Sequence, residues 1–335
     1  MKALVYAKPG VKVIDIPEPQ LQNPDDVRIK MAYSSVCGSD LHIAAGEYDL
    51  PEGFPMGHEG AGTVVELGPE AKTKGLKVGD KVTFYFNKYC GKCHYCRNGK
   101  ENFCTDVKMV VGAMSEYFVV SEQQVYLLDS NANLAEAALI EPISVCMHGL
   151  DLCKIKSGTS VAISGGGGIG QITMQLAKLA GASNVTMIEP ITWKRDIALE
   201  NGADYVIDPI NEDVCARVAE ITDGYMFDAV IECSGAAAAV KTAYDITGRG
   251  GTLEYLATYR SGVNMESIDM VSAFNKEATI ISGVYQSPYV LERSAKIYKR
   301  LNLSPLIQNV YSLADGEKAF ENQRNGKSLK SLYRL

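Results

Sequence analysis

The chain has 335 residues, enough for about two domains, and its 46% hydrophobic and 22% charged residues are the proportions of an ordinary soluble globular protein. Its formal net charge of −7 argues against a general nucleic-acid or anionic-membrane binder, which should be basic. No apolar run is long enough to cross a membrane, and the start of the chain is too quickly polar for a signal peptide. We therefore expect a cytoplasmic protein with no nucleic-acid and no membrane partner.

Residues 1–151 have the pattern of a β-rich domain. A first strand is expected over residues 1–7, and short apolar or alternating runs follow at residues 27–33, 62–67 and 79–84, separated by Gly, Pro and Asp turns. No long helical period occurs before about Leu134.

Three segments within this domain carry side chains that bind metals. They supply the Cys37 thiol, the His58 imidazole and the Glu59 and Glu141 carboxylates. Such a set can hold a catalytic zinc ion and leave a position for water or substrate. Taken singly, each residue has an ordinary structural interpretation: a buried thiol, a polar pair in a turn, or an acid at a helix start.

A fourth segment, residues 88–106, contains Cys90, Cys93, Cys96 and Cys104 in a C-x2-C-x2-C-x7-C arrangement. Four thiolates at close spacing are typical of a closed structural zinc site. An iron–sulfur cluster, a redox pair or a nucleic-acid-binding zinc ribbon are the alternatives. The other cysteines, Cys233 among them, have no ligand spacing and are interpreted as structural thiols.

A strand, tight turn and helix are predicted over residues 161–180, and this unit opens an alternating β/α domain at residues 152–283. Gly165, Gly167 and Gly170 have the G-x-G-x-x-G spacing of a dinucleotide site, with Gly168 and Ile169 inside the turn. The free N–H groups at the start of the helix would bind the pyrophosphate.

Glu189 ends the next apolar run, about 20 residues after the glycines, where a carboxylate would bind the ribose hydroxyls. Because it would repel a 2′-phosphate, NAD is favoured over NADP. Lys194 and Arg195 favour NADP instead, since a basic pair could hold the 2′-phosphate. Cys233 and Ser234 follow a later predicted strand, at the sheet edge where ligands bind in such folds.

In order and spacing, these motifs resemble the zinc-dependent medium-chain alcohol dehydrogenases over almost the whole chain. The carboxylate at Glu141 resembles the polyol branch, which includes sorbitol, butanediol and threonine dehydrogenases. The resemblance implies an α/β protein in which a GroES-like β-barrel catalytic domain (1–151 and 284–335) is interrupted by a Rossmann domain with a doubly wound parallel sheet (152–283).

The resemblance also implies roles for single residues. Cys37 and His58 would bind the catalytic zinc, while Glu59 and Glu141 would be ligands or near-ligands that exchange with water. Ser39 and His42 would relay the proton, and Val284 would lie near the nicotinamide. Ile43 departs from the aromatic residue of some relatives.

The predicted function is hydride transfer between NAD and a secondary alcohol or its ketone, such as a polyol, cyclitol, amino-alcohol or sugar alcohol. Two zinc ions per chain and a homodimer or homotetramer are expected. A zinc-free reductase of the same superfamily and a non-catalytic NAD-binding protein are the alternatives.

Overall fold

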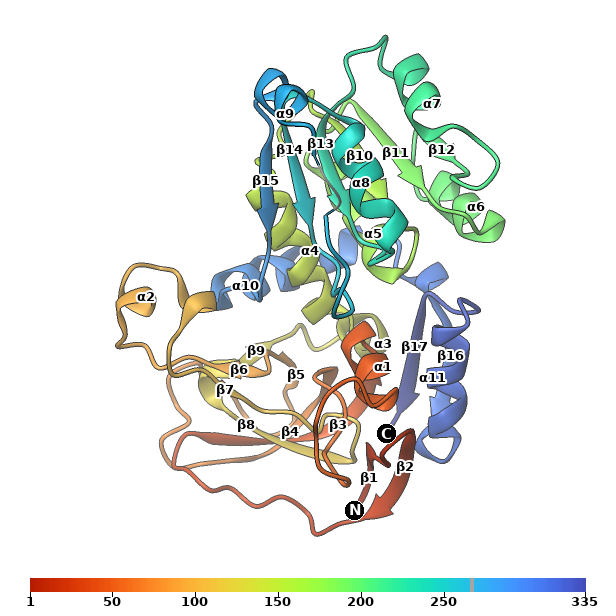
Figure 1. Cartoon of the computed structure of the whole chain (residues 1–335). Helices are drawn as coiled ribbons and strands as arrows, with labels where there is room; N and C mark the ends of the chain where they lie inside the picture. The colour runs from red at the N-terminus through yellow and green to blue at the C-terminus, as the bar shows by residue number, and fades with distance from the viewer. Residues whose placement is uncertain (266–267) are drawn as a thin grey trace. The chain divides into compact units, whose positions relative to one another are not determined.

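The computed structural model of the chain describes residues 1–265 and 268–335 (Figure 1). The chain divides into two compact units. The first unit comprises Met1–Ser144 and Gln286–Leu335, and the second comprises Val145–Tyr285. The boundary expected at 151/152 lies at the end of helix α4 (Ile140–Leu152), whereas the two units part after Ser144, within that helix.

The first unit is built on one large sheet. Seven strands form it, in the order β16-β17-β3-β4-β5-β9 with β8 paired to β3. The strands of this unit are β1 (Lys2–Tyr6), β2 (Val11–Asp15), β3 (Asp26–Ser35), β4 (Glu59–Leu67), β5 (Lys81–Phe84), β6 (Asn87–Lys88), β7 (Lys108–Met109), β8 (Tyr117–Ser121), β9 (Val125–Leu127), β16 (Ile307–Ser312) and β17 (Lys330–Arg334). Alternate residues of β3 (Val27, Ile29 and Met31) are buried, as expected for a strand with one face on a core.

Short helices connect these strands. They are α1 (Gly38–Ala44), α2 (His94–Arg97), α3 (Leu134–Ala137), α10 (Pro288–Ile297) and α11 (Gly316–Arg324), with 3₁₀ turns η1 (Glu101–Phe103), η2 (Glu122–Gln124), η3 (Tyr298–Arg300), η4 (Ser304–Leu306) and η5 (Leu313–Asp315). The sequence analysis did not predict α1 and α2, because seven and four residues are too few to show a helical period. Helix α1 is defined instead by its capping box, in which the Asp40 carboxylate accepts the Cys37 backbone N–H at 2.9 Å.

The second unit is a six-stranded parallel sheet with strand order β12-β11-β10-β13-β14-β15. This is the doubly wound order: the first strand, β10, lies at the centre, the next two strands lie on one side of it, and the last three lie on the other side. Its elements are α4, β10 (Ser160–Ser164), α5 (Gly168–Leu179), β11 (Asn184–Ile188), α6 (Thr192–Glu200), β12 (Tyr205–Ile207), α7 (Val214–Ile221), β13 (Phe227–Glu232), α8 (Ala237–Asp245), β14 (Thr247–Tyr255), α9 (Met270–Lys276) and β15 (Thr279–Ser282). The fold class is therefore the one expected.

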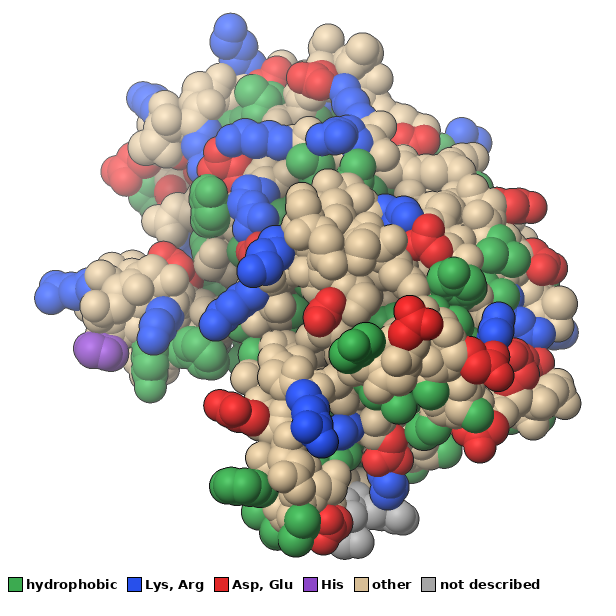
Figure 2. Space-filling view, turned by 90° about the horizontal axis from the view of Figure 1, so that it is seen from above, with side chains coloured by type: hydrophobic (Ala, Val, Ile, Leu, Met, Phe, Trp, Pro, Cys, Tyr) green, Lys and Arg blue, Asp and Glu red, His purple; other side chains and the backbone are tan. Residues whose placement is uncertain are grey.

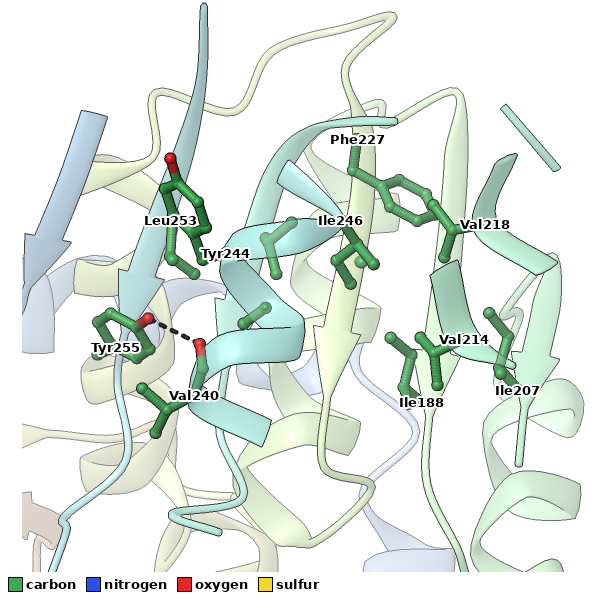
Figure 3. Close-up of a cluster of buried hydrophobic side chains, with 13 residues drawn as sticks. Ile188, Ile207, Val214, Val218, Phe227, Val240, Tyr244, Ile246, Leu253 and Tyr255 are labelled. Atoms are coloured by element: carbon green, nitrogen blue, oxygen red, sulfur yellow. Dashed lines mark hydrogen bonds between the residues drawn. The ribbon is translucent and has the colours of Figure 1, made fainter. Parts of the chain in front are cut away.

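One core of the second unit lies between the sheet and helices α7 and α8 (Figure 3). Phe227 and Val230 of β13 and Leu253 of β14 are completely buried there. The hydroxyl of Tyr255 donates to the Val240 carbonyl at 2.8 Å, so this polar atom is satisfied inside an apolar cluster (Figure 3). The rigid sheet fixes the strand ends that carry the predicted cofactor residues.

The surface carries both signs of charge. Lys, Arg, Asp and Glu side chains all occur on the face seen in Figure 2. Among the described helices, none is long and apolar enough to span a bilayer.

Candidate metal and cofactor sites

Cys37, His58 and Glu59 come together at one end of the large sheet. Strands β3 and β4 are antiparallel, and their register sets Ser35 opposite Glu59. Cys37, which caps α1, therefore lies beside the start of β4. The ligand atoms of the three residues all lie within 4.8 Å of one another. We call them the metal triad; a thiolate, an imidazole and a carboxylate at this spacing suit a zinc ion.

Two buried charged residues surround the metal triad. Lys330 of β17 donates to Glu59 Oε2 at 2.7 Å and to the Val36 carbonyl at 3.0 Å. Burial opposes the charge of Lys330, but the Glu59 carboxylate raises its pKa above the ordinary value, so the ammonium stays charged. The Asp40 carboxylate lies 3.8 Å from His58 Nδ1, and the Phe86 ring lies 4.9 Å from the His58 ring. These contacts orient the imidazole and the carboxylate of the triad.

Glu141 is buried near the metal triad but is not part of it. Its Oε1 accepts a hydrogen bond of 2.9 Å from Gln286 Nε2, which also donates to Ser144 Oγ at 2.6 Å. Ser144 Oγ in turn donates to the Glu141 carbonyl at 2.6 Å. Burial raises the pKa of Glu141 to about 7.

Cys90, Cys93, Cys96 and Cys104 form a second cluster whose sulfur atoms all lie within 4.8 Å of one another. The Cys90–Cys96 and Cys93–Cys104 sulfur distances are 3.9 and 4.0 Å. A tetrahedron with Zn–S bonds of about 2.3 Å has edges of about 3.8 Å, so the four thiols fit a zinc ion. Backbone N–H groups of Cys96 and Thr105 lower the pKa of Cys93, whereas burial and the neighbouring thiols raise the pKa of Cys96. The cluster thus favours the thiolate at Cys93 and the neutral thiol at Cys96.

The glycine turn between β10 and α5 requires its glycines for different reasons. Gly165 has φ +99°, and a Cβ there would lie 2.8 Å from Ser234. A Cβ on Gly170 would lie 1.8 Å from the Gly165 carbonyl oxygen, so helix and turn could not pack. Gly167 caps α5, and nothing lies within 4 Å of a Cβ placed on it. That open backbone suits the close approach of a pyrophosphate.

Glu189 is bound to the same turn. Its Oε2 accepts the Gly166 N–H at 2.7 Å, and its Oε1 accepts the Ile191 N–H at 2.9 Å. Arg195 is occupied as well: it donates to the Glu189 carbonyl at 2.7 Å and pairs with Asp208 at 3.0 Å. Lys194 is largely buried, with its ammonium 5.6 Å from the centre of the Trp193 ring.

The carboxyl end of β13 is organised by Glu232. This buried carboxylate accepts the Ser234 N–H at 2.8 Å and the Gly235 N–H at 3.2 Å, and it also binds the Tyr259 and Ser234 hydroxyls. Burial raises the pKa of Cys233 well above its ordinary value, which favours the neutral thiol over the thiolate.

Comparison with known proteins identifies the family. Residues 23–130 match the model of the alcohol dehydrogenase GroES-like domain, and residues 168–299 match that of zinc-binding dehydrogenases. The chain belongs to the zinc-type alcohol dehydrogenase family.

Similar proteins cover the chain from end to end. An L-threonine 3-dehydrogenase from Pyrococcus horikoshii is 35% identical over 100% of the chain and 99% of that protein, and a sorbitol dehydrogenase from Halalkalibacterium halodurans is 31% identical over 99% and 98%. Among solved structures, a zinc-binding dehydrogenase from Clostridium scindens has a TM-score of 0.94 at 32% identity, covering 100% and 99% of the two chains. A zinc-binding dehydrogenase from Sinorhizobium meliloti, bound to NADP, has a TM-score of 0.90 at 30% identity, covering 100% and 99%. The chain is therefore an oxidoreductase of the zinc-binding alcohol dehydrogenase type.

The predicted relay residues lie on helix α1, which was not predicted from the sequence. Ser39 and His42 are on α1, three residues apart and thus on one side of the helix. His42 Nδ1 lies 2.7 Å from Glu47 Oε2, an arrangement that leaves the other ring nitrogen as a proton acceptor when Nδ1 is the donor. Val284 is half exposed and follows β15 in the second unit.

The sequence analysis missed Asp40, Lys330 and Gln286. Asp40 carried a usable signal, because an acid three residues after a helix cap is a capping-box pattern. Lys330 and Gln286 carried no such sequence signal, because their carboxylate partners, Glu59 and Glu141, are 271 and 145 residues away in the chain.

Proposed function

We propose that the chain is a zinc- and NAD-dependent dehydrogenase that interconverts a secondary alcohol and its ketone, with a polyol, cyclitol, amino-alcohol or sugar alcohol as substrate. The observation that carries this proposal is the convergence of Cys37, His58 and Glu59 to within 4.8 Å in a chain that also has a complete four-cysteine cluster. A zinc-free reductase would need neither set of ligands.

In this proposal, Cys37 and His58 would hold a zinc ion, which would supply Lewis acidity toward a substrate hydroxyl. Ser39 would accept the alcohol proton, and His42, oriented by Glu47, would be the next proton acceptor of the relay. Lys330 and Asp40 hold the Glu59 and His58 side chains in place. The glycine turn opened by Gly165 would hold the dinucleotide, which would supply the nicotinamide as hydride acceptor.

We propose NAD rather than NADP because the Glu189 carboxylate stands beside the glycine turn. A 2′-phosphate would meet this negative charge. Of the two nearby cations, Arg195 is already paired with Asp208, and Lys194 is largely buried against the Trp193 ring. The NADP-bound relative is the reason to test both cofactors.

The test is zinc content per chain together with oxidation of a panel of polyols by NAD and NADP. We expect two zinc ions and turnover on one class of secondary alcohol. Cys37→Ala should lose one zinc and at least about 10³-fold in turnover, because an enzyme without its metal loses its main electrostatic stabilisation. Cys93→Ala should lose the other zinc.

Cys215→Ala, which removes a half-buried thiol outside both clusters, is the matched control and should keep both zinc ions and turnover. Full turnover by Cys37→Ala would support the zinc-free reductase instead. Dinucleotide binding without turnover on any alcohol would support the non-catalytic protein.

We also propose that two copies of the chain associate through the β15 edge of the second unit, as a homodimer or as half of a homotetramer. Strand β15 ends the sheet order, so among the described strands it has a neighbour, β14, on one side. Ile280 on this strand is 42% exposed, and α9 exposes Met270, Val271 and Phe274 by 68–85%. An edge strand flanked by apolar side chains is a template for pairing with another chain.

The cytoplasm remains the proposed compartment, because thiolates of the four-cysteine cluster need reducing conditions.

A further inference from the structure

Gln286 is a buried amide in contact with a candidate metal-binding carboxylate. Its side chain is 1% exposed, and both protons of its Nε2 are used: one bonds Glu141 Oε1 and the other bonds Ser144 Oγ. Because Ser144 Oγ donates to the Glu141 carbonyl, the backbone and the carboxylate of Glu141 are fixed by one small network.

The backbone of Gln286 is itself held in place. The Tyr89 hydroxyl donates to the Gln286 carbonyl at 2.8 Å, and the Gln286 N–H lies 3.4 Å from the Tyr85 hydroxyl. These two hydroxyls are 3.0 Å apart, and Asn87 Nδ2 donates to that of Tyr85. All these residues are buried in the first unit, so the amide cannot turn away from Glu141 without breaking several hydrogen bonds.

The position of Glu141 differs from that of the metal triad. The ligand atoms of Cys37, His58 and Glu59 lie within 4.8 Å of one another, and Glu141 is outside this set although it is also buried. Glu59 has a cationic partner in Lys330, whereas the partner of Glu141 Oε1 is the neutral Gln286 amide.

We propose that Gln286 is a positioning residue that holds the Glu141 carboxylate beside the metal triad and keeps it from becoming a permanent fourth ligand. The inference rests on the proposed zinc site. A neutral amide suits this role, because it holds the carboxylate by a hydrogen bond that is weaker than an ion pair and can break when ligands exchange. The fourth position then stays available to a substrate hydroxyl.

The test replaces Gln286 by Leu, which keeps most of the volume and removes the donor. The catalytic zinc is exchanged for Co²⁺, whose visible spectrum reports the number and type of its ligands, while the four-cysteine zinc is retained. We expect Gln286→Leu to shift the Co²⁺ spectrum toward an added oxygen ligand and to slow removal of the metal by a chelator. Turnover should fall about 10- to 100-fold, the usual effect of losing a residue that orients a metal ligand.

The double variant Gln286→Leu/Glu141→Gln should lose the spectral shift, because no carboxylate is then available. Gln124→Leu is the matched control. Gln124 is another buried glutamine of the first unit, and its amide donates to the Tyr85 carbonyl. The Co²⁺ spectrum and turnover of this variant should match those of the unaltered protein.

An unchanged Co²⁺ spectrum in Gln286→Leu, or faster loss of the metal, would overturn the proposal, since Gln286 would then be structural or would direct Glu141 onto the metal. Failure of the proposed function looks different. In that case the unaltered protein and Cys37→Ala would take up the same amount of Co²⁺.

Discussion

Glu254 is a buried carboxyl group that the proposed reaction does not use. It lies on β14 with no exposed surface, its Oε1 has no hydrogen-bond partner among the described residues, and the Cys153 thiol lies 3.6 Å from its Oε2. Two glycines make room for it: a Cβ on Gly149 would lie 2.6 Å from Oε2, and one on Gly283 would lie 2.9 Å from Oε1. Burial raises the pKa of Glu254 to about 7 from an ordinary value of 4.5.

This pKa predicts a loss of stability as the pH rises. The folded chain holds the Glu254 proton more tightly than the unfolded chain, so ionisation favours unfolding between about pH 4.5 and 7. We expect Glu254→Gln to match the unaltered protein near pH 5 and to be more stable at pH 8, by at most about 3 kcal/mol, since each pKa unit is worth about 1.4 kcal/mol. Thermal unfolding across this pH range measures the difference.

Glu200→Gln, at the exposed end of α6, is the control and should show no such dependence on pH. Cys153→Ala should keep most of the dependence of the unaltered protein, because burial rather than the thiol is the main cause of the shift. A Glu254→Gln protein whose advantage stays constant from pH 5 to 8 would show that Glu254 does not ionise in this range.

Single residues were predictable from sequence where the chemistry is local. The four cysteines of residues 90–104 predict their cluster by spacing alone, and the structure brings the four sulfurs together. Cys37 and His58 needed the family resemblance, because 20 residues separate them in the chain. Glu254 gave no signal, since the pattern of a strand does not reveal that one of its buried positions is a carboxyl group facing two glycines.

The glycine turn allows folding and cofactor binding to be separated at the scale of one element. Gly170→Ala should destabilise the second unit by several kcal/mol, because its Cβ would lie 1.8 Å from a backbone oxygen that cannot move without opening the turn. Gly167→Ala should leave stability unchanged within about 1 kcal/mol, because the position has open space and φ −70°. It should weaken NADH binding at least about tenfold, since the methyl group takes the place of the pyrophosphate.

Thermal unfolding and NADH titration of both variants make the comparison. Gly202→Ala, at a glycine outside the turn, is not a suitable control, because that residue has φ +101° and would be strained. Glu200→Ala, at the exposed end of α6 in the same unit, is the control and should leave NADH affinity unchanged. Unchanged NADH affinity in a stable Gly167→Ala protein would move the dinucleotide away from this turn.

Elements with a strong period were predictable, and short ones were not. The run from residue 161 predicts strand, turn and helix, and the structure has β10 and α5 there. Residues 250–256 predict a strand by their sequence, but β14 begins earlier, at Thr247. It passes through Gly248, Gly250 and Gly251, which hide the strand pattern. Residues 296–301 predict a helical segment by their sequence, and the structure has the end of α10 followed by η3 there. The helix begins earlier, at Pro288, which suits the first helical position.

At the scale of the whole molecule, the sequence predicts the two-unit organisation because one region alternates strands and helices and the other does not. The unit boundaries follow from packing that no pattern reveals, since α4 is one helix that begins in the first unit and continues into the second. The assembly surface could not be predicted from the sequence either. A sequence does not show whether the apolar residues of α9 face a core or the solvent, and only the structure shows that they are exposed.

That surface gives the last prediction. If two copies pair through β15, a charge at Phe274, which is 85% exposed on α9, will be buried without a partner in the assembly. Phe274→Glu should therefore weaken association at least about tenfold, while the fold of the separate chain stays intact because the side chain packs on little else. Sedimentation velocity over a range of protein concentrations measures the change.

Ile210→Glu is the matched control: Ile210 is 76% exposed and follows β12, at the opposite edge of the same sheet, so its variant should assemble normally. Equal dissociation of both variants would show that added charge acts nonspecifically, and normal assembly of Phe274→Glu would place the contact on another face.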